Sequence, residues 1–112
     1  RQGVEKARHT AEFMTITFDV REEWRDRIPA VVHVDGTARP QLVRQPVNPK
    51  YHGLITEYER LSGIPLVLNT SFNVHEEPIV CSPNEAIRAL AEGRVDCLAI
   101  GAWWAEGSKK HE

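Results

Sequence analysis

The alternation of apolar and polar residues predicts three strands. Residues 13–20 are rich in β-formers, and their apolar side chains recur at every second position from Met14 onward, which indicates a strand with one buried face. Residues 64–68 are apolar on both alternating faces, which is typical of a strand covered on both sides in the middle of an α/β sheet. A last strand is predicted over residues 95–104, centred on residues 97–100.

Two segments carry complete helix signals. Asn48 can cap a helix and Pro49 suits its first position, and apolar residues then recur at helical spacing until Gly63. The second helix is predicted to begin at Ser82, where the sequence Ser-Pro-Asn-Glu forms a capping box, and to end at Gly93. The apolar segment 64–68 follows the first helix, and the predicted strand 95–104 follows the second.

The remaining segments connect these elements. Residues 21–27 are charged and predict a short helical turn or loop before Pro29. The pair Asp35-Gly36 predicts a turn between two extended arms. Apolar strands separated by helices predict an α/β fold, in one domain spanning residues 1–112 with residues 1–12 and 107–112 flexible. The first residues are polar and aperiodic and predict an irregular tail.

Composition and charge exclude several classes of protein. The net charge of −2 argues against nucleic acid or an anionic membrane as the main partner, and no apolar run approaches the about 20 residues that span a bilayer. The first residues lack the apolar core of a signal peptide, and the chain begins with Arg rather than Met, so we expect a fragment of a longer, cytoplasmic protein. Cys81 and Cys97 fall in segments predicted to be buried, as small apolar residues of a reducing compartment.

A polar loop follows the apolar segment 64–68. Its residues Asn69, Thr70, Ser71 and Asn73 offer hydrogen-bond donors and acceptors at short reach. Open α/β sheets bind ligands beyond the carboxyl ends of their strands, so this loop is a candidate site for a carboxylate, phosphate or carbamoyl group. The alternative is a turn whose side chains satisfy only the local backbone.

Arg39 and His33 are the other candidates for ligand contact. A planar guanidinium suits bidentate contacts to phosphate or carboxylate, although a surface arginine is the alternative. His33 precedes the Asp35-Gly36 turn and could face the same site, with a structural histidine as the alternative. The histidines show no paired metal spacing, so no metal site is expected in this chain.

Four segments of the sequence resemble a known family when they are taken together and in order. They are VREEWR at residues 20–25, PAVVHVDGTARPQ at 29–41, LNTSFN at 68–73 and EPIVCSP at 77–83. The sequence resembles the C-terminal region of the O-carbamoyltransferases, a group that includes nodulation and antibiotic-tailoring enzymes. The resemblance implies that the chain is the last part of a YrdC-like domain, a twisted mixed sheet flanked by helices.

The same resemblance implies an activity for the longer protein. Such enzymes form carbamoyl-adenylate from carbamoyl phosphate and ATP, with Mg²⁺, and a separate N-terminal domain with an iron-type metal site transfers the carbamoyl group to a hydroxyl acceptor. The resemblance implies that Arg39 contacts the anionic ligand and that Ser71 and Asn73 hold the adenylate. Thr70 and His33 are weaker matches to ligand-contacting positions. No nucleophilic side chain is required.

The sequence departs from the family pattern in the loop. Members commonly have a glycine just before the Glu-Pro-Ile run, where this chain has Glu76, preceded by His75. Other basic ligand contacts of the family lie upstream of this chain, so the alternative is a catalytically inactive nucleotide-binding or interaction module. A truncated domain exposes apolar surface, which makes self-association an expectation.

Overall fold

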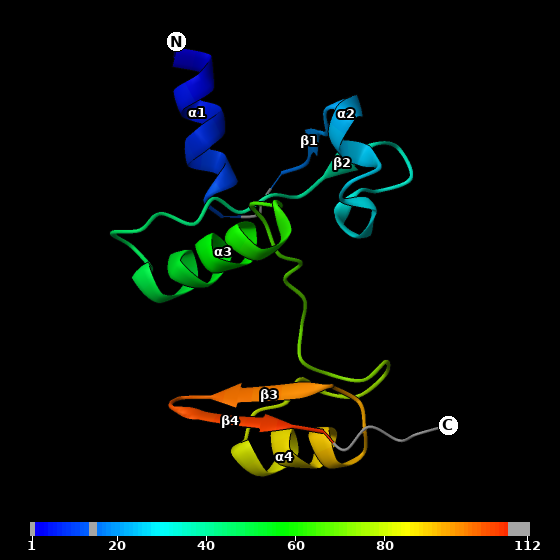
Figure 1. Cartoon of the computed structure of the whole chain (residues 1–112). Coiled ribbons are helices and arrows are strands. Elements are labelled where there is room, and N and C mark those ends of the chain that lie inside the picture. The colour runs from blue at the N-terminus through cyan, green and yellow to red at the C-terminus, as the bar shows by residue number, and fades with distance from the viewer. Residues whose placement is uncertain (1, 14–15, 108–112) are drawn as a thin grey trace. The chain divides into compact units, whose positions relative to one another are not determined.

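The computed structural model describes residues 2–13 and 16–107 of the chain, apart from the side chains of residues 2–4. Its contacts divide it into two compact units, Arg1–Asn69 and Thr70–Glu112, each described here by itself. The first unit contains α1 (Gln2–Ala11), β1 (Phe18–Asp19), α2 (Glu22–Arg25), the 3-10 helix η1 (Pro29–Val31), β2 (Thr37–Ala38) and α3 (Pro49–Ser62) (Figure 1). The second contains α4 (Pro83–Ala91), β3 (Cys97–Ile100) and β4 (Trp103–Glu106). The predicted α/β class is confirmed.

The two predicted helices are confirmed together with their caps. The side chain of Asn48 accepts a hydrogen bond from the backbone N–H of Tyr51 at 3.2 Å, and Gly63 ends α3 in the left-handed conformation with φ of 74°. Ser82 Oγ accepts from the Glu85 backbone N–H at 3.3 Å, while Glu85 Oε2 accepts from the Ser82 N–H at 3.2 Å. Each cap lies within one turn of its helix end, and is set by the local sequence alone.

Helix α1 lies where the sequence predicted an irregular tail. Its apolar residues Val4, Ala7 and Ala11 recur at helical spacing, a short stripe that the sequence prediction overlooked, and Ala11 is buried. Most of its other residues are good helix formers, so propensity also supports this helix. Thr10 Oγ1 donates to the Lys6 carbonyl at 2.8 Å within the helix. Beyond it, the backbone N–H of Leu42 donates to the Ala11 carbonyl at 2.9 Å, which joins α1 to the segment after β2.

The Asp35-Gly36 turn is confirmed, but the arm predicted before it, residues 31–34, contains no strand. The His33 carbonyl accepts from the Gly36 N–H at 2.9 Å, and the His33 N–H donates to the Thr37 carbonyl at 2.7 Å. Of the residues before the turn, Val31 ends η1, which begins at Pro29 because proline fixes φ near the helical value, whereas Val32 has an extended backbone with φ of −99° and ψ of 125°. Strand β2 therefore pairs antiparallel with β1, in the register Phe18↔Ala38 and Asp19↔Thr37.

The predicted strands are only partly correct. Of residues 13–20 only Phe18–Asp19 form a strand, and residues 14–15 lie outside the described residues. Residues 64–68 form no strand, and Leu68 is 60% exposed rather than covered on both sides. A strand needs the backbone of a neighbouring strand, and within the described residues no strand pairs with this segment.

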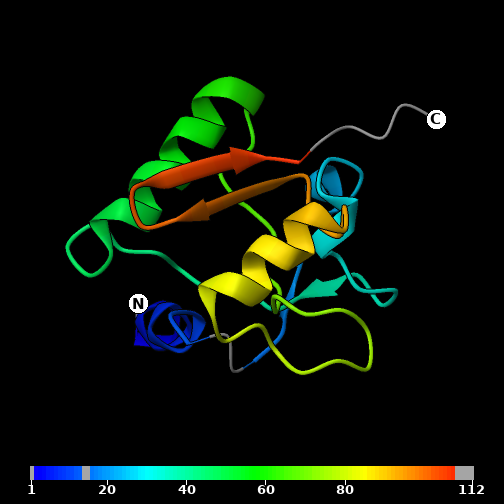
Figure 2. The same ribbon diagram turned by 90° about the horizontal axis from the view of Figure 1, so that it is seen from below.

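The predicted last strand is a hairpin. Strands β3 and β4 pair antiparallel from Cys97↔Glu106 to Ile100↔Trp103, and Gly101 between them has φ of 57°. Helix α4 packs against β3, and both views show it beside the hairpin (Figure 2). Ala86 and Ala89 are the buried residues of α4, three positions apart on one face, so small side chains mark this contact.

Few side chains are buried. Among the described residues, the buried apolar side chains are only Ala11 in the first unit and Ala86 and Ala89 in the second. The prediction that Cys81 and Cys97 are buried is wrong, because both are exposed. Several large apolar side chains are also exposed, Trp103 by 83% and Leu61 by 71%. Over the described part of the chain, none of the helices combines the length and the apolar character needed to cross a membrane.

Candidate ligand-binding site

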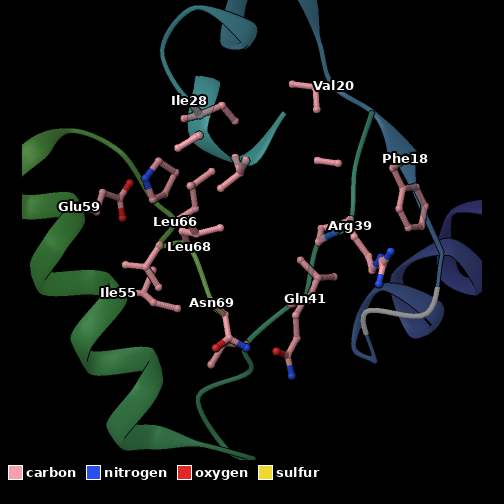
Figure 3. A pocket seen from close by; sticks show the side chains of 18 of the residues that line it. Phe18, Val20, Ile28, Arg39, Gln41, Ile55, Glu59, Leu66, Leu68 and Asn69 are labelled. Atoms are coloured by element: carbon pink, nitrogen blue, oxygen red, sulfur yellow. The ribbon is translucent and has the colours of Figure 1, made fainter. Parts of the chain in front are cut away.

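The first unit contains a cavity of about 720 Å³. Its walls are one face of α3, the segment 65–69 that follows α3, and residues 18–20 and 28–43 on the opposite side (Figure 3). The lining is mostly apolar, with Ile55 and Leu66 among the side chains that face it. Polar groups lie at intervals around this apolar lining. A volume of this size falls within the range of about 300–1,000 Å³ that holds small molecules.

Arg39 is the cationic side chain of the lining. It follows β2 directly, and Figure 3 shows it beside Phe18, across the cavity from α3. Its side chain is exposed and makes no hydrogen bond or ion pair with any other described residue. A guanidinium whose five donors are unengaged is suited to a phosphate or carboxylate group. The predicted ligand contact of Arg39 thus has a cavity beside it, and its role remains a prediction.

His33 lines the same cavity as Arg39. Its Nδ1 lies 3.3 Å from Thr37 Oγ1. The hydroxyl of Thr37 donates to Asp35 Oδ1 at 2.7 Å, and the Thr37 backbone N–H donates to the same oxygen at 3.0 Å. The hydrogen bond from the Thr37 hydroxyl lowers the pKa of Asp35 most, and the one from the Thr37 backbone N–H lowers it further. The nearby His33 adds to the effect. The turn therefore holds an ionised carboxylate next to a cavity-lining histidine.

The other predicted ligand residues lie in the second unit. Thr70 and Ser71 are exposed, and their hydroxyls make no hydrogen bond with the rest of the described chain. Asn73 differs, because its Nδ2 donates to the carbonyls of Val74 and Glu77, both at 3.2 Å. A side-chain amide has two N–H donors, so in this loop the donors of Asn73 are engaged and its Oδ1 remains for a ligand.

The loop after Asn73 is held in a defined turn. The Glu77 backbone N–H donates to the Val74 carbonyl at 3.0 Å, and Glu76 has a φ of +67°. A positive φ at the third residue of such a turn is what a type II turn requires, and glycine is the residue that adopts it without strain. Arg94 Nη1 also donates to Glu77 Oε2 at 2.9 Å. The loop therefore keeps the backbone shape of a glycine turn although it carries a glutamate.

The structure distributes the predicted residues between its two units. It brings His33 and Arg39 to one cavity, and it places Thr70, Ser71 and Asn73 on one loop of the second unit. Sequence reasoning missed part of the cavity lining. Residues 52, 55, 56 and 59 line it from α3, and this i, i+3, i+4, i+7 spacing is the signal that could have placed them on one helix face.

Among the described residues, no group of three or more His, Cys, Asp or Glu side chains is placed to hold a metal ion.

Fold and site together define an α/β polypeptide with an arginine-bearing cavity suited to an anionic ligand. The family model described as carbamoyltransferase C-terminus matches residues 2–106. The chain therefore belongs to the carbamoyltransferase C-terminus family, which confirms the resemblance of its four sequence segments.

Individual relatives agree with this assignment. An uncharacterized protein of Methanocaldococcus jannaschii is 44% identical over 89 residues, which are 80% of this chain and 17% of that protein. Nodulation protein NolNO of Sinorhizobium fredii is 39% identical over 97 residues, 87% of this chain and 14% of that protein. Nodulation protein U of Rhizobium tropici is 42% identical over 84 residues, 75% of this chain and 14% of that protein. The chain thus spans less than a fifth of the length of these relatives.

Proposed function

We propose that this chain is the C-terminal part of an O-carbamoyltransferase. The whole protein would form carbamoyl-adenylate from carbamoyl phosphate and ATP, and would then transfer the carbamoyl group to a substrate hydroxyl. One observation carries the proposal: in a chain that matches the carbamoyltransferase C-terminus over residues 2–106, Arg39 stands at a cavity with its guanidinium unengaged by any described residue.

The chemistry needs the groups that this chain offers. Water first cleaves the O–P bond of carbamoyl phosphate, which gives carbamate and inorganic phosphate. A carbamate oxygen then bonds to the α-phosphorus of ATP, the bond from that phosphorus to the bridging oxygen breaks, and pyrophosphate leaves. Several negative charges meet, so catalysis depends on positioning and on offsetting charge, with Mg²⁺ supplied alongside ATP. Arg39 would offset charge on one ligand, and the hydroxyls of Thr70 and Ser71 would donate to phosphate oxygens. Asn73 would help to hold the adenylate through its Oδ1, while its Nδ2 keeps the loop in shape.

The second candidate is a nucleotide-binding or interaction module that is catalytically inactive by itself. The exposed apolar side chains favour it, because monomeric proteins rarely expose large apolar surfaces that have no partner. Under this second candidate, the site for the hydroxyl acceptor lies in another part of the longer, cytoplasmic protein to which this chain belongs. The isolated chain then self-associates through its apolar surface.

The test of the first candidate is carbamoyl phosphate-dependent exchange of pyrophosphate into ATP by the full-length protein. Removal of a preorganised charged donor lowers rates by about 100-fold, which is the loss expected for Arg39→Ala. Arg39→Lys should restore part of the rate, because lysine keeps the charge but lacks the bidentate fork. Ser71→Ala should lose about tenfold, as for one hydrogen bond to a charged ligand.

The matched control is Arg44→Ala. Arg44 is an exposed arginine of the same unit, and it pairs with Glu12 at 3.4 Å. Its loss should leave exchange unchanged. Unchanged exchange in both Arg39→Ala and Ser71→Ala would contradict the ligand contacts proposed for these two residues.

Calorimetric titration of the 112-residue chain with ATP tests the second candidate. Micromolar binding by the chain alone would favour the module, because it would show that the ligand groups present here suffice for affinity. Sedimentation of the same sample measures the expected self-association. A monomer without measurable ATP affinity would argue against the module.

A further inference from the structure

The strongest unassigned feature of the molecule is a hydrogen-bond chain beside the cavity, formed by Asp35, Thr37 and His33. It begins at an ionised carboxylate and ends on an imidazole ring that lines the cavity. A chain of this kind determines which ring nitrogen carries the hydrogen, because each nitrogen's state follows from the hydrogen bond that the other one makes.

The direction of each bond follows from the number of hydrogens available. A hydroxyl has one hydrogen, and Thr37 donates its own to Asp35 Oδ1 at 2.7 Å. The lowered pKa of Asp35 keeps this carboxylate ionised at neutral pH, so it can only accept. The Thr37 oxygen must therefore accept from His33 Nδ1, 3.3 Å away. In the neutral ring Nδ1 then carries the hydrogen, and Nε2 keeps its lone pair.

From this arrangement we propose that His33 Nε2 accepts a hydrogen bond from the amino group of the carbamoyl ligand. This inference rests on the proposed function and adds a determinant of specificity to it. The carbamoyl group differs from an acetyl group by an amino group in place of a methyl group. Only a hydrogen-bond acceptor distinguishes the two, since their size and shape are nearly the same.

His33 suits this role better than the carboxylates and the glutamine amide that also line the cavity. His52 lines it too, but its Nδ1 contact with Thr56 Oγ1 is longer, at 3.5 Å, than the 3.3 Å between His33 Nδ1 and Thr37 Oγ1. The carboxylates of Asp19 and Glu59 also line it, but a carboxylate near the phosphate of the ligand would repel it. The amide of Gln41 can present either its oxygen or its nitrogen. In its neutral form, with the Nδ1 hydrogen donated to Thr37, His33 presents Nε2 as an acceptor at the same cavity as Arg39, which suits the phosphate end of the same ligand.

Kinetics of the full-length protein test the contact. His33→Ala should raise KM for carbamoyl phosphate about three- to tenfold, the loss of one neutral hydrogen bond, with kcat of exchange unchanged because ground and transition states share the contact. Acetyl phosphate, used as a competitive inhibitor, should keep its Ki, because it has no amino group to lose. His33→Gln should recover part of the affinity through its side-chain oxygen. Thr10→Val, which removes a threonine hydroxyl in α1, is the control and should change neither constant.

The hydrogen position is tested separately by long-range ¹H–¹⁵N correlation spectra of the 112-residue chain at alkaline pH. The expected result is a protonated Nδ1 and an unprotonated Nε2 for His33. Thr37→Val should shift the proton toward Nε2, and His52, whose Nδ1 lies 3.5 Å from Thr56 Oγ1, should keep its signals as an internal reference.

Each outcome decides one question. A wild-type spectrum with the hydrogen on Nε2 overturns the inference, as do equal increases in KM for carbamoyl phosphate and Ki for acetyl phosphate. The absence of carbamoyl phosphate-dependent exchange in the wild-type protein overturns the proposed function, and the role of His33 with it.

Discussion

Replacement of Glu76 by glycine should stabilise the loop that carries Ser71 and Asn73. Glu76 has a φ of +67°, in the left-handed region where a side chain crowds its own backbone. An L-residue there costs about 1–2 kcal/mol, a strain that glycine does not have. Glycine in turn loses about 0.4–1 kcal/mol more entropy when the chain orders. The net expectation for Glu76→Gly is a gain of about 0.5–1 kcal/mol.

Hydrogen exchange at one amide measures this gain. The Glu77 N–H donates to the Val74 carbonyl at 3.0 Å and closes the turn, so it exchanges only when the turn opens. A gain of this size should slow its exchange by about two- to fivefold at constant pH and temperature. The amides at the start of α4 should not change, because they are held by the capping box.

The control separates the backbone from the side chain. The carboxylate of Glu76 lies 3.9 Å from His75 Nε2 with both side chains almost fully exposed, and such a pair contributes little. Glu76→Ala removes the carboxylate but keeps Cβ, so it should not slow exchange at Glu77. If Glu76→Ala protects the Glu77 amide as well as Glu76→Gly does, the explanation from the backbone angle is refuted.

Two further predictions concern the turn before β2 and the start of α4. Gly36 has φ of +81°, and a Cβ there would lie 2.7 Å from Cζ of Arg25. The flexible Arg25 side chain can move away from that Cβ. The backbone strain of the positive φ, about 1–2 kcal/mol, should therefore be the destabilisation that remains in Gly36→Ala. Protection of the Val20 amide, which donates to the Gly36 carbonyl, should then fall by about five- to thirtyfold. Several hydrogen bonds lower the pKa of Glu85, and the one from the backbone N–H of Cys81 contributes most. The stabilisation from this cap is therefore fully present above the ordinary pKa of 4.5, and it is lost as the pH falls through the lower pKa that Glu85 has in the folded chain. The exchange protection factor of the Cys81 amide should drop on acidification below that range, and Glu85→Gln should remove this dependence.

The sequence predicted those elements whose causes lie within a few residues. The caps at Asn48 and Ser82, the stop at Gly63 and the Asp35-Gly36 turn were all correct, because each depends on hydrogen bonds or dihedral angles of neighbouring residues. The family resemblance could also be recognised from the sequence alone, because it rests on residue identity in four segments rather than on a folded arrangement. Helix α1 was missed because its apolar stripe, Val4, Ala7 and Ala11, is short and lies among many charged and polar residues.

Strand pairing could not be predicted, because it depends on a partner that the strand itself does not specify. The apolar pattern of residues 64–68 is real, yet this segment pairs with no strand of the described chain and instead lines the cavity through Leu66 and Leu68. An apolar face indicates that a segment will be covered, and a helix or a ligand can cover it as well as a sheet. The same limit applied to the candidate site: Arg39 was recognised from its own chemistry, but the wall opposite it on α3 became visible only when the fold brought that helix face to the cavity.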